Sequence, residues 1–172
     1  MRKVLFIFGQ LTDSDVDWLA SQGRRVRLPK GSVLIREGVP VDALYIVLDG
    51  ELVVVQEQTK RQIASLGAGE IVGEMSFIDA RPPSATVRAA TDVVVYMVEK
   101  QRLQQGLDDN IAFAARFYRA VATFLSDRVR KATASQEGVD ADAADELDDS
   151  VLDNVDRAGA RFHDLSRRLL DA

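Results

Sequence analysis

The sequence predicts an α+β protein, in which an antiparallel sandwich or barrel of about eight strands is flanked by helices. Three observations predict this class. Short β-branched runs, separated by Gly, Pro and Asp, recur about every ten residues over residues 24–99. A capped helix signal precedes this region. After it, the spacing of the apolar residues changes from two to about 3.6, which is typical of helices.

The composition is that of an ordinary globular domain and excludes several classes of site. Of the 172 residues, 47% are hydrophobic and 28% are charged, so no disordered chain is expected. The chain has no cysteine, which excludes disulfides, thiolate metal sites and cysteine nucleophiles. Its net charge of −5 gives no general attraction to nucleic acid. The apolar run at residues 4–8 is too short for a signal peptide or a membrane span, so we expect a cytoplasmic protein without a membrane partner.

A short N-terminal helix is predicted over residues 13–21. Thr12 and Asp15 have the spacing of a capping box, in which each side chain bonds to the backbone N–H group of the other residue. Apolar residues begin directly afterwards with Val16. We therefore expect the helix to begin after Thr12.

The clearest hairpin in the strand region is predicted over residues 43–56. Two apolar runs, LYIVL and ELVVV, flank the pair Asp49-Gly50. This pair tolerates the positive φ angles of a type I′ turn, which joins neighbouring strands of a hairpin. We therefore expect these two strands to pair with each other.

A long helix is predicted after the strands, beginning at an Asp or Asn cap among residues 108–110 and ending near Ala134. Apolar residues from Ile111 to Val129 form a broad face, which must pack on another element. Five basic side chains also lie along this helix, and we interpret them as a solvated face. They are Arg116, Arg119, Arg128, Arg130 and Lys131.

The remaining chain divides into an acidic linker and a C-terminal helix. Residues 135–149 are predicted to be a solvated linker, since residues 136–149 hold seven acids and no base. In residues 150–172 the apolar side chains recur at steps of four and three, which predicts an amphipathic helix. This helix is too short to require a coiled coil, so it can dock on its own domain or on a partner. Residues 1–134 form the predicted domain.

Two short segments near the end of the strand region form a candidate anion site. In the first, a glycine and a carboxylate stand at the start of a short helix, whose free backbone N–H groups and positive dipole end suit a phosphate. The second segment follows a short loop. The candidate ligand-binding residues are Gly73, Glu74, Met75 and Ser76 in the first segment and Ser84, Ala85 and Thr86 in the second.

These segments resemble the phosphate-binding cassette of the cyclic nucleotide-binding domain family. Further motifs support the resemblance, which covers residues 11–130. They are Leu28-Pro29-Lys30-Gly31, Arg36-Glu37-Gly38, Leu44-Tyr45-Ile46-Val47-Leu48 with the residues up to Leu52, and Leu66-Gly67-Ala68-Gly69-Glu70. The resemblance implies an eight-stranded antiparallel β-roll, similar to a jelly roll, with an N-terminal helix and a C-terminal helix that closes over the pocket.

The resemblance also implies a role for each matching residue of the cassette. Gly73 would let the backbone approach the ligand, and Glu74 would accept a hydrogen bond from a ribose hydroxyl. The backbone N–H groups of Met75 and Ser76 would face the cyclic phosphate. Ser84 matches a residue that often donates to the phosphate.

The family's arginine, which neutralises the phosphate, is missing from this cassette. Pro83 occupies its position and offers neither a cation nor an N–H group. The lost pair of charge-assisted hydrogen bonds costs roughly 3–6 kcal/mol, which is on the order of a hundred- to ten-thousandfold in affinity. Arg81 lies two residues earlier, and its side chain could replace the missing arginine if the Pro82-Pro83 segment is extended.

The resemblance implies a small regulatory module that senses cyclic AMP or cyclic GMP and transmits binding through its C-terminal helix. Pro83 leaves an alternative open, which is a ligand-independent interaction or oligomerisation module with a degenerate pocket. A partner protein or a second copy would then bind through the C-terminal helices. No enzyme is expected, because no nucleophile has a base nearby and His163 is the single histidine. We expect no resident cofactor, no metal site and, without a basic recognition helix, no nucleic-acid partner.

Overall fold

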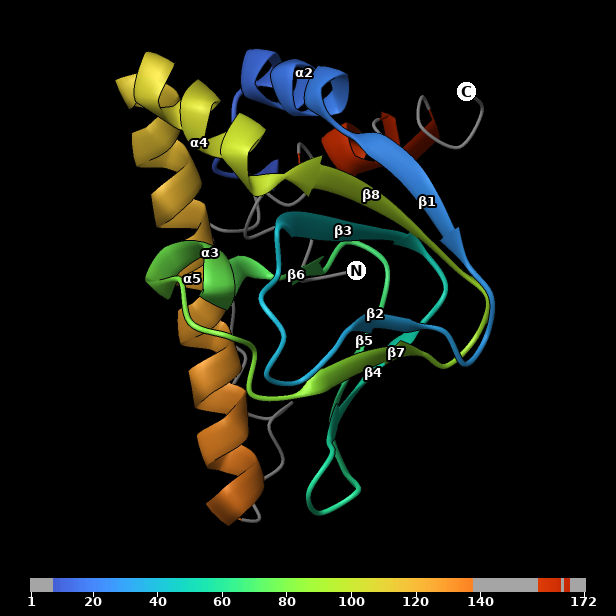
Figure 1. The fold of residues 1–172 in the computed structure, drawn as a ribbon. Coiled ribbons are helices and arrows are strands. Elements are labelled where there is room, and N and C mark those ends of the chain that lie inside the picture. The colour runs from blue at the N-terminus through green and yellow to red at the C-terminus, as the bar shows by residue number, and fades with distance from the viewer. Residues whose placement is uncertain (1–7, 138–157, 165, 168–172) are drawn as a thin grey trace.

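The computed structural model describes residues 8–137, 158–164 and 166–167, and its strands form two antiparallel sheets that face each other (Figure 1). The first sheet has the strand order β1-β8-β3-β6, and the second has the order β2-β7-β4-β5. Eight strands in two sheets, with helices at both ends, confirm the predicted β-roll. The strands are β1 (Arg24–Leu28), β2 (Val33–Ile35), β3 (Ala43–Asp49), β4 (Leu52–Gln56), β5 (Arg61–Leu66), β6 (Ile71–Val72), β7 (Thr86–Ala89) and β8 (Val93–Glu99).

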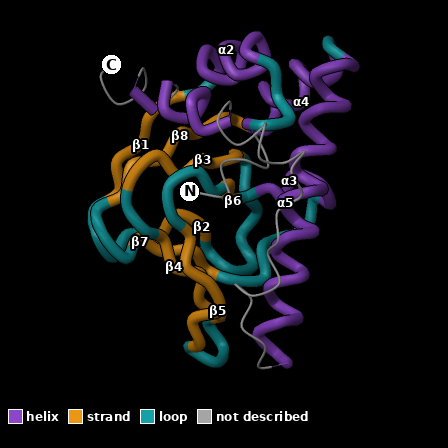
Figure 2. Tube along the Cα trace, turned by 180° about the vertical axis from the view of Figure 1, so that it is seen from behind, coloured by secondary structure: helices purple, strands orange, loops and turns teal. Residues whose placement is uncertain are grey.

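The helices lie beside the first sheet and along one side of the roll (Figures 1 and 2). Residues 158–164 and 166–167 are also helical and lie next to the N-terminal helix, and we call them the C-terminal helix. The other helices are α2 (Asp13–Gln22), α3 (Glu74–Asp79), α4 (Lys100–Asp109) and α5 (Ile111–Glu137).

The start of α2 is a capping box, as the sequence predicts. Thr12 Oγ1 accepts a hydrogen bond from the backbone N–H of Asp15 at 3.2 Å. In return, Asp15 Oδ2 accepts one from the backbone N–H of Thr12 at 2.8 Å. These two bonds satisfy donors that a helix N-terminus otherwise leaves free, so they fix where α2 begins.

The predicted hairpin over residues 43–56 is wrong, because β3 and β4 lie in different sheets. β3 pairs with β6 and β8, whereas β4 pairs with β5 and β7. The turn at Gly50 exists, with φ of +84°, but it carries the chain from one sheet to the other. A Cβ atom at Gly50 would lie 2.3 Å from the carbonyl oxygen of Asp92, so the crossing requires glycine. Both edges of β3 already have partners, which leaves no place for β4 beside it.

Two apolar cores follow from the alternation of side chains along the central strands. In β3, Val47 points toward the second sheet and packs with residues such as Leu52 and Val95. Its neighbours Ile46 and Leu48 point the other way and pack with the helices. The second core is rich in aromatic residues. They are Phe8, Tyr96, Phe113, Phe117 and Phe124.

The long helix α5 begins where the sequence predicts, after a cap among residues 108–110, and a helix that was not predicted from the sequence, α4, precedes it. Asn110 Oδ1 accepts a hydrogen bond from the backbone N–H of Phe113 at 2.9 Å, so Asn110 caps α5. α4 packs closely on α2 through Gly106, where a Cβ atom would lie 2.1 Å from the indole ring of Trp18. α5 continues to Glu137, slightly beyond the predicted end.

The C-terminal helix packs on its own domain. Ala158 is fully buried, and the Phe162 ring lies 5.6 Å from the ring of Phe8. The predicted acidic linker and the other apolar positions of residues 150–172 lie outside the described residues, apart from the last residues of α5. Within the described part of the chain, we find no helix with the length and apolar character that crossing a membrane requires.

Candidate functional site

The cassette begins with Gly73, which no other residue could replace unless the surrounding backbone moved. Gly73 precedes α3 with φ of +93°, a left-handed conformation that side chains rarely adopt. A Cβ atom there would lie 2.7 Å from the carbonyl oxygen of Ala43. The close approach of this turn to β3 sets the position at which α3 starts.

Glu74, the first residue of α3, is a buried carboxylate paired with an arginine of α5. Its side chain is only 4% exposed, and its Oε1 accepts from Nη1 of Arg128. Burial raises the pKa of Glu74, while the positive charge of Arg128 acts in the opposite direction. The Arg128 guanidinium also lies over the Phe124 ring, 5.0 Å from its centre. The ion pair therefore joins the cassette to the long helix.

Aromatic side chains add a second contact between α3 and α5. The ring of Phe77 lies 5.8 Å from that of Phe117 and 6.5 Å from that of Tyr118. Figure 2 shows α3 against the middle of α5, which runs along the side of the roll. A displacement of α3 would therefore move both an ion pair and a packed apolar contact on α5.

The interpretation of the arginines on α5 as a solvated face is wrong for two of them. Arg128 pairs with Glu74, and Arg116 forms two hydrogen bonds with the buried carboxylate of Asp15. The sequence does carry a signal for Arg128, because it follows Phe124 by four residues and therefore lies on the same apolar face of α5. Nothing local identifies its acidic partner, which lies 54 residues earlier in the chain.

Arg81 lies away from the carboxylate of the cassette. Its side chain is 84% exposed, and its Nε is 3.9 Å from Oδ2 of Asp79. The carbonyl oxygen of Pro83 accepts a hydrogen bond from the backbone N–H of Gly38 at 2.8 Å, which ties this loop to the turn after β2. The structure thus brings Arg128, rather than Arg81, to Glu74.

The remaining candidate residues differ in exposure. Met75 is 57% exposed, whereas Ser76 is buried. Ser84 is exposed at the loop, and Ala85 and Thr86 are buried behind it. Thr86 Oγ1 accepts a hydrogen bond from the backbone N–H of Glu37 at 3.1 Å, so this hydroxyl serves the turn after β2 in the observed arrangement. Their roles in ligand binding stay predictions.

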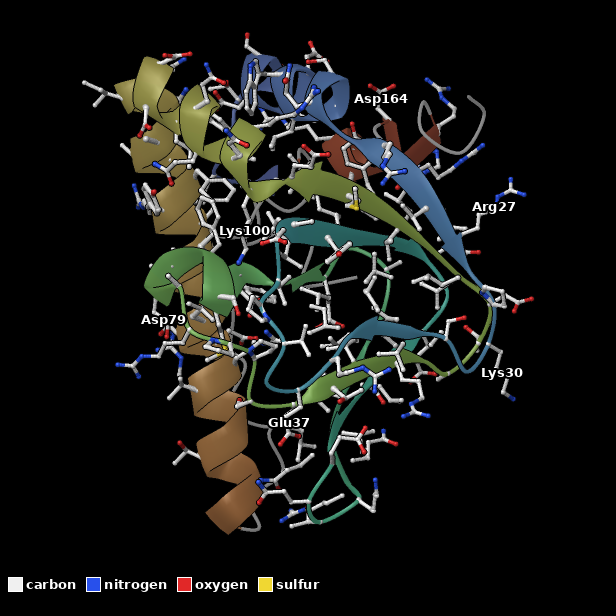
Figure 3. The ribbon with its side chains drawn as sticks, viewed as in Figure 1. Arg27, Lys30, Glu37, Asp79, Lys100 and Asp164 are labelled. Carbon is white, nitrogen blue, oxygen red and sulfur yellow. The ribbon has the colours of Figure 1, made fainter. Side chains whose placement is uncertain are left out.

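A further cation lies near the far end of α3. Lys100, at the start of α4, and Asp79, at the end of α3, lie on the same side of the roll (Figure 3). Burial lowers the pKa of Lys100, and the charges of Asp42 and Asp79 act against this. The charge of Lys100 therefore interacts with the C-terminal end of α3. Among the described residues, Arg128 is the cation that contacts the carboxylate of Glu74.

Residues 25–110, half of the chain, match the family model of the cyclic nucleotide-binding domain. The chain belongs to the cyclic nucleotide-binding domain family. The matched residues include Gly73, Glu74 and Pro83 of the predicted cassette. Among the described residues, no group of three or more His, Asp or Glu side chains is placed to hold a metal ion.

Similar proteins include both isolated domains and parts of larger regulators. A cyclic nucleotide-binding domain from Methylobacillus flagellatus is 28% identical with a TM-score of 0.68, covering 76% of this chain and 78% of that one. The N-terminal domain of a transcriptional regulator from Streptomyces coelicolor is 31% identical with a TM-score of 0.62, covering 73% of this chain and 94% of that one. A cAMP-dependent protein kinase regulatory subunit of Emericella nidulans is 36% identical over 70 residues, 41% of this chain. The match spans only 17% of that subunit.

Proposed function

We propose that this domain is a regulatory module that binds a cyclic nucleotide at the cassette and transmits binding through α5. The observation that carries the proposal is the ion pair between Glu74 and Arg128, because it links the carboxylate of the cassette to the long helix α5. Support also comes from two relatives whose names describe regulators, the fungal cAMP-dependent kinase subunit and the bacterial transcriptional regulator.

Ligand binding would redistribute the hydrogen bonds of this ion pair. A ribose hydroxyl that donates to Glu74 competes directly with Arg128 for the carboxylate oxygens. The cyclic phosphate is itself an anion, and a guanidinium can donate two parallel hydrogen bonds to it. Arg128 would then move from Glu74 toward the phosphate and supply the cation that Pro83 cannot provide.

This exchange provides a physical reason for α5 to respond. Arg128 is part of α5, and Phe77 of α3 packs on Phe117 and Tyr118 of the same helix. A ligand that draws Arg128 and α3 into a new arrangement has different contacts in the two states, which is what shifts a conformational equilibrium. In the structure, Glu74 binds Arg128.

Calorimetric titration of the full chain with cyclic AMP, cyclic GMP and a cyclic dinucleotide tests the proposal. We expect saturable binding by the wild type and a loss of about 10- to 100-fold in affinity for Arg128→Gln. Arg130→Gln is the matched control, since Arg130 is exposed on the same helix. Arg81→Ala tests the other candidate cation and should bind as the wild type does.

Three outcomes would contradict parts of the proposal. Absence of saturable heat with every nucleotide would reject nucleotide sensing. Tighter binding by Arg128→Gln would mean that Arg128 only competes with the ligand. Loss of binding in Arg81→Ala alone would assign the cation to Arg81 instead.

A second candidate function is favoured by the outer face of α5. Ile111 is 82% exposed and Val129 is 65% exposed, although both are large apolar residues. Tyr118 is also exposed between them, and the spacing of these positions is close to that of a coiled-coil seam. A second copy of the chain could therefore pair along α5, with or without a ligand. Sedimentation of the wild type and of Val129→Glu tests this, and a wild-type monomer at all concentrations would reject it.

A further inference from the structure

We propose that the C-terminal helix is the output element of this domain, because three ion pairs in series connect its docking on α2 to the cassette carboxylate. The first pair is Arg161–Asp13, the second is Asp15–Arg116, and the third is Arg128–Glu74. The inference rests on the proposed function only for the ligand that would start the change. The connection itself can be tested without any ligand.

Arg161 attaches the C-terminal helix to the segment that leads into α2. Its Nη1 donates to the carbonyl oxygens of Phe8, at 3.1 Å, and Leu11, at 2.6 Å. Its Nε donates to Oδ1 of Asp13 in the first turn of α2. One guanidinium thus satisfies three acceptors of the N-terminal region, a geometry that lysine cannot reproduce.

Apolar packing accompanies these hydrogen bonds. Ala158 is fully buried in the aromatic core, and Phe162 lies against Phe8. Phe8 is itself fully buried, so release of the C-terminal helix would expose its ring. The docked helix and α2 lie side by side in both views of the molecule (Figures 1 and 2). The C-terminal helix therefore covers an apolar surface that its release would make available.

The first turn of α2 holds both the C-terminal helix and α5. Asp13 contacts Arg161, and Asp15, two residues later, binds Arg116 through two hydrogen bonds. Asp15 is also part of the capping box with Thr12, so its carboxylate has a fixed position. A movement of this turn therefore changes both ion pairs at once.

α5 carries the connection from Arg116 to the cassette. Arg128 lies further along the same continuous helix, about 18 Å away at ~1.5 Å per residue. A helix of this length moves as a rigid element, so a pivot at the Arg128 end acts on the Arg116 end. When Arg128 leaves Glu74, we expect the Asp15–Arg116 contact to shift. The ion pair between Arg161 and Asp13 should then weaken. Coupling of this kind is reciprocal, so release of the C-terminal helix must also alter the Glu74–Arg128 contact.

Amide hydrogen exchange of the ligand-free full chain tests the coupling. Glu74→Gln should accelerate exchange in residues 158–167 by at least about fivefold, the lower end of typical coupling between sites. Glu57→Gln is the matched control, because Glu57 forms exposed ion pairs with Lys60 and Arg88 that do not involve α5. It should leave exchange in residues 158–167 unchanged.

Coupling in the reverse direction, from the C-terminal helix to the cassette, can be tested with the single tryptophan as a reporter. Trp18 lies on α2, and its ring is 5.3 Å from that of Phe113 of α5. Arg161→Lys should shift the emission of Trp18 and accelerate exchange in α3, whereas Arg167→Lys on the same helix should do neither. Asp13→Asn is a milder variant in case Arg161→Lys does not fold, since the Asp13 side chain is largely exposed.

The outcomes separate this inference from the proposed function. If Glu74→Gln accelerates exchange only in α3 and α5, the three ion pairs act independently and the inference is overturned. If the coupling is present but no cyclic nucleotide binds, the inference stands and the nucleotide proposal fails. Where cyclic AMP does bind, it should accelerate exchange in residues 158–167 of the wild type, and unchanged or slower exchange there would contradict an output role.

Discussion

Arg116 of α5 donates two hydrogen bonds to the carboxylate of Asp15 in α2, from Nε at 2.7 Å and from Nη2 at 2.8 Å. The two residues lie 101 positions apart in the sequence. Asp15 is buried, and it is also the capping-box partner of Thr12. One carboxylate therefore fixes the beginning of α2 and the position of α5 relative to it.

This pair predicts a specific dependence of stability on pH. Burial of Asp15 disfavours its charge, but hydrogen bonds from Arg116 and Thr12 outweigh this and lower its pKa. A carboxylate with a lowered pKa stabilises the fold above its unfolded pKa of about 3.9, and this contribution disappears as the pH falls through the folded pKa. Asp15→Asn should lower the unfolding free energy at pH 7 by about 1–3 kcal/mol. In urea titrations between pH 3 and 7, it should also show a weaker pH dependence than the wild type, and equal slopes would contradict this.

Gly73→Ala should displace α3 and destabilise the domain. The variant combines an unfavourable positive φ with a contact of 2.7 Å to the backbone of β3. Gly31→Ala is the matched control, because Gly31 has φ of +88° but no atom within 4 Å of its Cβ position. Gly31→Ala should cost about 1 kcal/mol from backbone strain alone. Thermal denaturation of both variants checks this, and equal losses would show that the close approach to β3 is unimportant.

Tyr96→Phe should destabilise the C-terminal end of α2. The Tyr96 hydroxyl donates to the carbonyl oxygen of Ala20 at 2.7 Å and accepts from the backbone N–H of Gly23 at 2.8 Å. Removing it leaves partly buried backbone groups without partners, at a cost of about 1–3 kcal/mol. Urea denaturation measures this loss. Tyr118→Phe, at an exposed position on α5, should change stability by less than about 0.5 kcal/mol.

Pro83→Arg should strengthen nucleotide binding by restoring the family's cassette arginine. The carbonyl oxygen of residue 83 still accepts from Gly38 after the substitution, so the loop keeps its contact with the turn after β2. We expect at least about a tenfold gain in affinity, measured by calorimetry, from one or two new charge-assisted hydrogen bonds. In the Arg128→Gln background the gain should be larger. Unchanged affinity in both backgrounds would show that residue 83 does not face the phosphate.

Features that depend on neighbouring residues could be predicted from the sequence. The Thr12–Asp15 capping box and the number of strands are confirmed, because spacing and turn residues within a few positions determine them. The partner of a strand depends on the whole sheet. The apolar runs on either side of Gly50 therefore predicted strands correctly and paired them wrongly.

The candidate site divides in the same way. Local sequence identified the glycine and the carboxylate of the cassette. The cation that contacts the carboxylate is Arg128, which lies 54 residues later in the sequence. Because Arg128 is charged, we assigned it from the sequence to a solvated face of the helix. Its position on the apolar side of α5, four residues after Phe124, was the available signal.

The crossing of the chain between sheets at Gly50 also has a consequence for how the protein folds. Among the described strands, β4 and β5 are the only consecutive pair that hydrogen-bond to each other, while β1 pairs with β8 and β2 with β7. The first strands, β1 and β2, can therefore pair only after the last strands, β7 and β8, have formed. Such high contact order slows folding, typically to milliseconds or seconds. We expect the β4–β5 hairpin to form early and the closure of β8 between β1 and β3 to limit the rate.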